Sequence, residues 1–111
     1  INTWLAMGDE NNANGCLKIL PGTHLLPSDN EMVDDNLFLN VENPKAKQWL
    51  EQSIDVELGA GDVLFFHAGL FHAANKNLTD QAKYSLVYSY PGQNNAPLPG
   101  SNSTKYEEVL I

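Results

Sequence analysis

The sequence has no arginine, a single cysteine and no long hydrophobic run. Its six basic residues, all lysines, stand against fourteen acidic residues and give a formal net charge of −8 at pH 7. This balance argues against the basic patch that nucleic acids and anionic membranes require. No apolar segment approaches the roughly 20 residues that a membrane-spanning helix needs. We therefore expect a small-molecule or protein partner, and neither a nucleic acid nor a membrane.

The scarcity of cysteine bears on the compartment. Cys16 is alone and cannot form an internal disulfide, so a reducing cytoplasm is the simplest setting. The 111 residues are enough for one small domain with a modest core. The sequence starts at Ile1 in a strand-like run, without an initiator methionine or a signal-type apolar stretch. We therefore expect it to be a fragment of a longer protein.

Most of the elements that the sequence predicts are short β-strands. Strand-like runs occupy residues 1–7, 16–20, 54–58, 63–67, 70–72 and 82–90. The first two runs flank Asn14-Gly15, a strong tight-turn signal, and this arrangement predicts a hairpin. The runs 54–58 and 63–67 are separated by a glycine-rich turn, so we expect them to pair or to lie side by side.

The remaining segments predict one helix, one long loop and a tail. Asn43-Pro44 supplies an N-cap and a proline at the first helical position, which predicts a helix over 44–52. Residues 23–42 lack a regular period and are expected to form an irregular excursion, with a short strand near 37–39. Residues 1–92 then form a mainly β domain, a sandwich or part of a barrel, and residues 93–111 a partly flexible tail.

The chemistry-bearing residues give few local motifs. There is no His-Glu-x-x-His, no Cys-x-x-Cys and no Gly-x-Ser-x-Gly. His67 and His72 flank a turn and could reach a common cavity, but a lone histidine on a strand is more often a hydrogen-bonded structural residue. Taken singly, neither histidine can be assigned as a ligand.

Several runs become informative when they are taken together. In order, they are Trp4-Leu-Ala-Met, Asn14-Gly-Cys-Leu-Lys-Ile-Leu-Pro-Gly-Thr-His24, Gly61-Asp-Val-Leu-Phe-Phe-His67 and Leu70-Phe-His72, followed by Asn77 and Lys83. Over most of residues 1–90 this order and spacing resembles the phytanoyl-CoA dioxygenase family. The resemblance implies a mainly β fold, a partial double-stranded β-helix or jelly-roll barrel with one short helix.

The resemblance also implies an iron(II) site with two histidines and one carboxylate, and 2-oxoglutarate as cosubstrate. His72 stands at the place of the second histidine ligand, whereas His24 and His67 fall on positions that are usually structural. The family places a basic residue, usually arginine, eleven positions after this histidine to pair with the far carboxylate of 2-oxoglutarate. That residue here is Lys83, whose point charge should grip a carboxylate less firmly than an arginine fork. Trp4 matches a tryptophan that lines the cosubstrate pocket.

The strand over residues 82–90 leaves two interpretations of Lys83 open. Lys83 and Ser85 share one face of this strand, and Tyr84 and Leu86 share the other. The first face either lines a polar barrel interior or points to water, which would make Lys83 a surface lysine. Trp4 is similarly either a pocket residue or plain core. We expect Asn77 to shape the turn that precedes Lys83.

What the chain lacks limits the functional expectation. The family's His-x-Asp pair, which supplies the other two iron ligands, precedes the tryptophan run, and no His-x-Asp occurs in this sequence. We therefore expect a fragment of a dioxygenase that hydroxylates a small organic substrate, inactive by itself and without an assigned catalytic residue. The alternative is a non-catalytic β-barrel binding module in which His72 is structural. Missing strands would leave unpaired sheet edges, which predicts a homodimer or a larger assembly.

Overall fold

The computed structural model describes residues 1–27, 31–34, 38–92, 94–96, 99–100 and 102–105. The elements along this part of the chain are β1 (Asn2–Ala6), β2 (Leu17–Ile19), the 3-10 helix η1 (Thr23–Leu25), α1 (Pro44–Leu50), β3 (Ile54–Val56), β4 (Val63–Phe66), β5 (His72–Ala74), β6 (Ser85–Ser89) and the 3-10 helix η2 (Asn102–Lys105). The expected fold class, mainly β with one short α-helix in the manner of a partial jelly roll, is confirmed for these residues.

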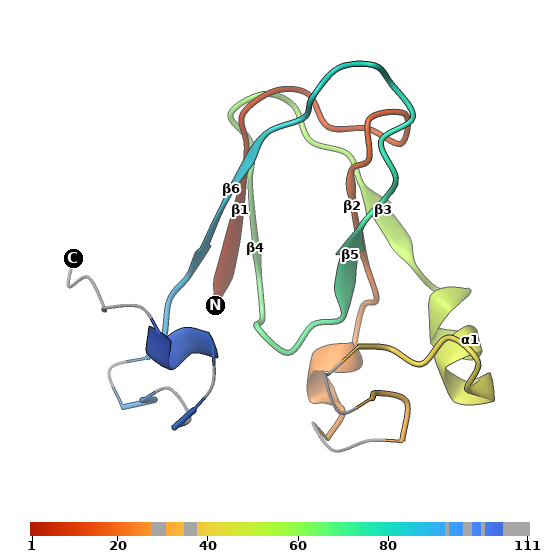
Figure 1. Ribbon diagram of the computed structural model, residues 1–111, viewed down its shortest axis with the longest axis vertical. Helices are drawn as coiled ribbons and strands as arrows, with labels where there is room; N and C mark the ends of the chain where they lie inside the picture. The colour runs from red at the N-terminus through yellow and green to blue at the C-terminus, as the bar shows by residue number, and fades with distance from the viewer. Residues whose placement is uncertain (28–30, 35–37, 93, 97–98, 101, 106–111) are drawn as a thin grey trace.

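The strands form two three-stranded antiparallel sheets, one in the order β4-β1-β6 and the other in the order β3-β2-β5. Figure 1 shows the sheets as two walls, joined by the β1–β2, β3–β4 and β5–β6 connections at the top and by the β4–β5 connection at the bottom, with α1 below β3. We call the end at the top of Figure 1 the loop end. Apart from β2 and β3, which pair with each other, strands that follow one another in sequence lie on opposite walls.

Two expected strand pairings are therefore wrong. The strands at the start of the chain do not form a hairpin, because β1 pairs with β4 and β6 whereas β2 pairs with β3 and β5. The strands on either side of the 59–62 turn also do not pair, since β3 and β4 lie in different sheets. Each of these connections crosses from one sheet to the other instead of reversing the chain within a sheet. Strands consequently take their hydrogen-bond partners from distant parts of the sequence.

The Asn14-Gly15 signal marks a close backbone approach rather than a hairpin turn. The side chain of Asn11 accepts hydrogen bonds from the backbone N–H groups of Ala13 and Asn14 and so closes this loop locally. Gly15 has φ 84°, and a Cβ atom there would lie 2.5 Å from the carbonyl oxygen of Asn75. Glycine is thus required at this position both by its dihedral angle and by the neighbouring segment.

One helix and one strand can be compared with the sequence expectations. The helix predicted over 44–52 is confirmed as α1, and its cap is Asn43, whose side chain accepts from the N–H of Lys45 at 2.8 Å. The strand expected at 70–72 lies instead at β5, because Leu70 and Phe71 belong to the β4–β5 connection.

No helix in the described part of the chain is both long and apolar enough to cross a membrane.

Two expectations fall partly outside the described residues. The short strand near 37–39 includes residue 37, which is not described, although Leu39 forms an isolated β-bridge with Val33. The flexible tail over 93–111 is described only in part, and that part contains η2. The prediction of flexibility stays a prediction.

The core lies between the two sheets. Leu17 on β2, Phe66 on β4 and Leu70 after β4 are buried and form one cluster. The half-buried hydrophobic residues packed against this cluster are Trp4, Ile19 and Leu64. Because β1 and β4 contribute from one wall and β2 from the other, this cluster holds the sheets face to face.

The outer face of the β4-β1-β6 sheet is also apolar. Phe65 and Tyr88 both stand opposite Thr3 in the strand register and therefore share this face, where they are 67% and 53% exposed. Val63 and Leu86, opposite Leu5, extend the same surface and are exposed as well. A contiguous apolar face of this kind usually contacts another surface.

We predict that the chain self-associates through this face, as the sequence led us to expect. Size-exclusion chromatography with light scattering should give a mass above that of one chain, decreasing on dilution. Phe65→Asp should shift the equilibrium toward the monomer, whereas Leu78→Asp, at another exposed apolar position, should not. A monomeric mass at every concentration would contradict this prediction.

A second prediction concerns the loop end of the fold. Gly15→Ala should lower the free energy of unfolding by about 2–3 kcal/mol, because it combines an unfavourable φ with a clash against backbone. Gly8→Ala is the matched control: its added Cβ meets nothing within 4 Å, so the change should stay within about 0.5 kcal/mol. Urea unfolding of both variants measures the difference, and equal stabilities would be the contrary result.

Candidate functional site

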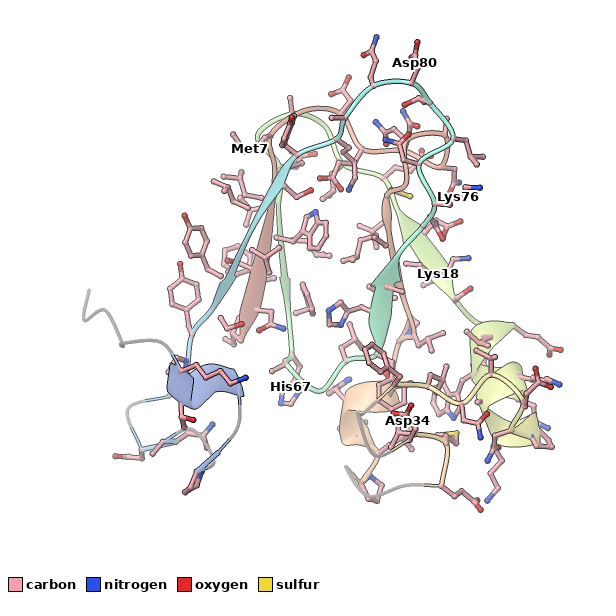
Figure 2. The ribbon with its side chains drawn as sticks, in the orientation of Figure 1. Met7, Lys18, Asp34, His67, Lys76 and Asp80 are labelled. Carbon is pink, nitrogen blue, oxygen red and sulfur yellow. The ribbon has the colours of Figure 1, made fainter. Side chains whose placement is uncertain are left out.

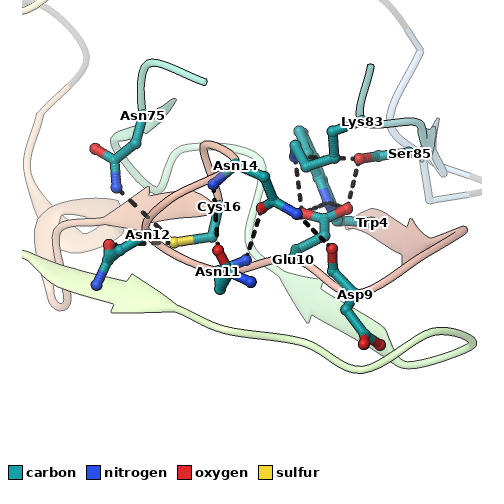
Figure 3. Close-up of polar contacts among 10 residues, drawn as sticks. All are labelled: Trp4, Asp9, Glu10, Asn11, Asn12, Asn14, Cys16, Asn75, Lys83 and Ser85. Carbon is teal, nitrogen blue, oxygen red and sulfur yellow. Dashed lines mark hydrogen bonds and ion pairs between the residues drawn. The ribbon is translucent and has the colours of Figure 1, made fainter. Parts of the chain in front are cut away.

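A buried carboxylate, Glu10, is the centre of a polar cluster at the loop end (Figure 3). Its side chain is fully buried, and both of its oxygens accept hydrogen bonds. Trp4 Nε1 lies 3.1 Å from each oxygen, and Ser85 Oγ donates to Oε1 at 2.6 Å. Lys83 Nζ donates to Oε2 at 2.9 Å and forms an ion pair. The carboxylate is therefore surrounded by donors from three other residues.

The strands and their register bring these residues together. Trp4 lies in the middle of β1, and Ser85 is the first residue of β6, opposite Ala6 of β1. Because Lys83 precedes Ser85 by two residues, both side chains point to the inner face, and only 13% of the Lys83 side chain is exposed. The backbone of Glu10 is held by Leu58, through N–H to carbonyl bonds of 2.8 and 3.0 Å. This inward placement of Lys83 decides between the two interpretations of the strand.

The Lys83 ammonium group also lies over an aromatic ring. Its Nζ atom is 5.1 Å from the centroid of the Trp4 ring, within the range of a cation–π contact. Nζ is 3.4 Å from Ser85 Oγ as well. Trp4 and Lys83, which the family resemblance assigned to cosubstrate binding, are thus neighbours in the structure, and Glu10 contacts both.

The contacts to Glu10 determine its acidity. Burial alone raises the pKa of this carboxyl group, because it disfavours the charged form. The hydrogen bonds from Ser85, Lys83 and Trp4, together with the positive charge of Lys83, act in the opposite direction and outweigh it. The net result is a pKa below the ordinary value, so Glu10 is ionised near neutral pH.

His72, the candidate iron ligand, is the first residue of β5 and is exposed. Its Nδ1 lies 2.8 Å from the carbonyl oxygen of Leu70. A carbonyl oxygen can only accept, so this bond requires the proton on Nδ1 and leaves the lone pair of Nε2 available in the neutral ring. Metal-binding histidines commonly have this arrangement. The ring packs edge-on against Phe66 of the opposite sheet, with centroids 4.9 Å apart.

The other two histidines are arranged differently. His67 Nδ1 accepts the N–H of Gly69 at 3.0 Å, so a neutral His67 ring carries its proton on Nε2 and has no free lone pair. The His24 ring lies beside His67, with centroids 5.5 Å apart. Figure 2 places His67 at the end of the molecule opposite to Met7 and Asp80 of the loop end. This geometry favours His72 over His67 as a ligand.

The side chains of the described residues do not form a complete iron site. In the described part of the chain no three His, Cys, Asp or Glu residues are grouped so that they could hold a metal ion. His72 therefore offers one ligand of the three that the family implies, and these residues do not fit iron by themselves. The cluster around Lys83 suits a carboxylate, since it presents an ammonium, a hydroxyl and an indole N–H to Glu10.

Asn77 shapes the connection between His72 and Lys83, as the sequence led us to expect. Its side-chain amide donates to the carbonyl oxygen of Gln81 at 2.8 Å. Its Oδ1 accepts from both the N–H and the hydroxyl group of Thr79, at 2.9 and 2.7 Å. These bonds fix the turn that carries the chain toward β6.

Two residues of the cluster, Glu10 and Ser85, were not expected from the sequence to be part of a site. Glu10 lies in a polar stretch that predicts a loop, and its partners Lys83 and Ser85 are 73 and 75 residues away. Ser85 could have been found, because it shares a strand face with Lys83. Nothing local to Glu10 distinguishes it from Asp9 or the other acidic residues.

Comparison with known proteins now identifies the family. Residues 1–85 match the family model described as "Phytanoyl-CoA dioxygenase (PhyH)". The chain belongs to the phytanoyl-CoA dioxygenase family. Within it, the chain is 29% identical over 83 residues to phytanoyl-CoA dioxygenase 1 of Oryza sativa subsp. japonica, covering 75% of this chain and 30% of that protein.

Two further comparisons agree. The chain is 29% identical over 117 residues to the peroxisomal phytanoyl-CoA dioxygenase of Rattus norvegicus, covering 96% of this chain and 30% of that protein. A crystal structure of EvdMO1 matches with a TM-score of 0.60 and 27% identity, covering 78% of this chain and 18% of that one. The chain thus spans about 30% of the length of these curated relatives.

The lowered pKa of Glu10 predicts how stability depends on pH. In the folded protein Glu10 binds its proton less readily than an ordinary glutamate, whose value is 4.5, so its contribution to stability is present above that pH. This contribution is lost as the pH falls below 4.5 through the folded pKa. We therefore expect the free energy of unfolding, measured with urea between about pH 3 and pH 6, to change less with pH in Glu10→Gln than in the wild type. The same pH dependence of the free energy of unfolding in both proteins would contradict the lowered pKa of Glu10.

Proposed function

We propose that this chain supplies the C-terminal part of an Fe(II)- and 2-oxoglutarate-dependent dioxygenase that hydroxylates a small organic substrate. Membership of the phytanoyl-CoA dioxygenase family supports the reaction class, because the family implies both iron and 2-oxoglutarate. We also propose that the chain by itself is inactive. Its length relative to the relatives and the single suitable histidine support this second point.

The observation that carries the proposal is the hydrogen bond of the His72 ring. With Nδ1 bonded to the carbonyl oxygen of Leu70, Nε2 keeps its lone pair and has no hydrogen-bond partner among the described residues. Packing against Phe66 restrains the ring on the side that faces the opposite sheet. His72 would thus contribute one ligand, and further ligands would have to come from residues other than those described here.

Iron bound at this site would supply the oxidative chemistry, in which oxygen hydroxylates the substrate while 2-oxoglutarate is converted to succinate and carbon dioxide. The roles that we assign to this chain are those of binding and placement. Lys83 would pair with the far carboxylate of 2-oxoglutarate, and Trp4 would line that part of the pocket. The described parts of the 23–42 excursion would border the substrate. We propose a cytoplasmic location, because the single cysteine, Cys16, cannot form an internal disulfide.

Anaerobic titration with Fe(II) and 2-oxoglutarate tests this proposal. The titration should be made on this chain and on a version extended by any coding sequence that precedes it. The extended version should develop the visible charge-transfer band of chelated 2-oxoglutarate, and this chain alone should not. His72→Ala should abolish the band, whereas His67→Ala should leave it in place because the Nδ1 of His67 is engaged by Gly69.

The controls separate the alternatives. Circular dichroism must show that each variant remains folded. A band that survives His72→Ala would remove His72 from the site. No band in either version would contradict the dioxygenase proposal and favour the binding module, a barrel that keeps the family fold without its chemistry.

A further inference from the structure

The position that the proposed function assigns to a ligand carboxylate is taken by a carboxylate of the chain itself. Lys83 Nζ lies 2.9 Å from Glu10 Oε2, and the Glu10 side chain is fully buried. The other two donors of the cluster are engaged as well, since Ser85 donates to Oε1 at 2.6 Å and Trp4 Nε1 lies 3.1 Å from both oxygens. The hydroxyl of Ser85 and the indole N–H of Trp4 therefore have no donor left for a second carboxylate, and the charge of Lys83 is already paired with Glu10.

The charges of the cluster lead to the same conclusion. The Glu10–Lys83 pair carries no net charge while both groups are ionised, so it offers no electrostatic attraction to an anion. A second carboxylate close to Lys83 would also be close to Glu10 and would be repelled by it. The two carboxylates are thus alternative occupants of one position.

The approach from solvent gives no compensating attraction. Lys83 lines a cleft of about 700 Å³ at the loop end, together with Asp9 and Asp80. Figure 2 shows Asp80 on the loop that closes this end of the molecule. One lysine and two aspartates leave the cleft walls with an excess of negative charge. An anion can therefore pair with the charge of Lys83 only by displacing Glu10.

We propose that Glu10 is an internal competitor for the carboxylate-binding position formed by Lys83, Ser85 and Trp4, and that it determines how tightly this chain binds a dicarboxylate cosubstrate. This inference rests on the proposed function, because it concerns the end of the site assigned to 2-oxoglutarate. The backbone of Glu10 is fixed by both of its hydrogen bonds to Leu58, so displacement is a rotation of the side chain.

Glu10→Gln is the variant that tests this role. The glutamine oxygen can accept from Lys83 and Trp4 while its amide group donates to the Ser85 hydroxyl, so the contacts can be kept and the charge removed. Lys83 then has an uncompensated charge that an external carboxylate can neutralise. Glutarate, without metal, is the probe, because it has the two carboxylates of 2-oxoglutarate but lacks the oxo group that chelates iron.

The Trp4 indole N–H provides the signal. The sequence has two tryptophans, Trp4 and Trp49, so a nitrogen-resolved NMR spectrum should contain two indole signals, of which only that of Trp4 comes from the cluster. In a glutarate titration of the full chain, Glu10→Gln should bind with a dissociation constant lower than that of the wild type by about tenfold or more. The Trp49 signal should stay in place.

Two matched variants establish specificity. Asp80→Asn removes the same charge from the cleft without touching Lys83, and should change the affinity by less than about threefold. The double variant Glu10→Gln with Lys83→Met should not show this increase in glutarate affinity, because the cation that binds the ligand is absent. An increase in glutarate affinity that persists in the double variant would overturn the proposal, as would an equal increase in Asp80→Asn.

The remaining outcomes are also decisive. If the wild type binds glutarate as tightly as a folded Glu10→Gln variant, Glu10 does not compete and the inference is wrong. Should Glu10→Gln fail to fold, Glu10→Asp replaces it: the shorter side chain withdraws from Lys83 and should tighten binding by about threefold. Since glutarate binding needs no iron, tighter binding by Glu10→Gln without a charge-transfer band in either version of the chain would leave the competition intact and refute the dioxygenase. The band without a gain would refute the competition alone.

Discussion

The buried Glu10 carboxylate is the interaction on which the loop end of this structure depends. Its side chain is bonded to Trp4 of β1 and Ser85 of β6, in one sheet. Its backbone pairs with Leu58, which follows β3 of the other sheet. A buried charge costs several kcal/mol unless it is paired and hydrogen bonded. Because the donors that meet this requirement come from elements far apart in the sequence, the carboxylate specifies how β1, β6 and the loop after β1 are placed together.

The two ends of the space between the sheets are held by different forces. The apolar cluster of Leu17, Phe66 and Leu70 packs the sheets against each other, and the His72 ring extends it through its contact with Phe66. Toward the loop end, polar contacts to Glu10 take over this role. The iron end that we propose is therefore built on hydrophobic packing and the cosubstrate end on a charge pair. A change at Glu10 should consequently affect ligand binding at Lys83 more than the setting of the His72 ring.

The sequence predicted which segments are strands better than it predicted how they pair. Alternation identifies the strands at 54–58 and 82–90 because successive side chains of a strand point to opposite faces of the sheet. Pairing is different, since the Asn14-Gly15 signal suits a hairpin as well as the close approach to Asn75 that the structure contains. Register between strands of different sequence regions depends on tertiary contacts that no local pattern encodes.

The same distinction applies to the site. His72, Lys83 and Trp4 were proposed as site residues through the family resemblance, and the inward orientation of Lys83 was one of two possibilities that the strand left open. Glu10 was missed because a carboxylate in a polar loop is recognisable as buried only through partners more than 70 residues away. The proton on Nδ1 of His72 likewise depends on the carbonyl of Leu70, a backbone position that composition does not reveal.

The choice of lysine makes the competition for this position exclusive. An ammonium group has three donors, and that of Lys83 faces Glu10 Oε2 at 2.9 Å and Ser85 Oγ at 3.4 Å, with the Trp4 ring centroid at 5.1 Å. An arginine, which the family usually carries here, has five donors in a planar fork and could hold an internal carboxylate on one edge and a ligand on the other. The Lys83 ammonium is a compact point charge without a second planar edge, and this charge is already paired with Glu10. The consequence of replacing arginine by lysine therefore depends on Glu10, and the two residues act as one unit in setting the affinity of this site.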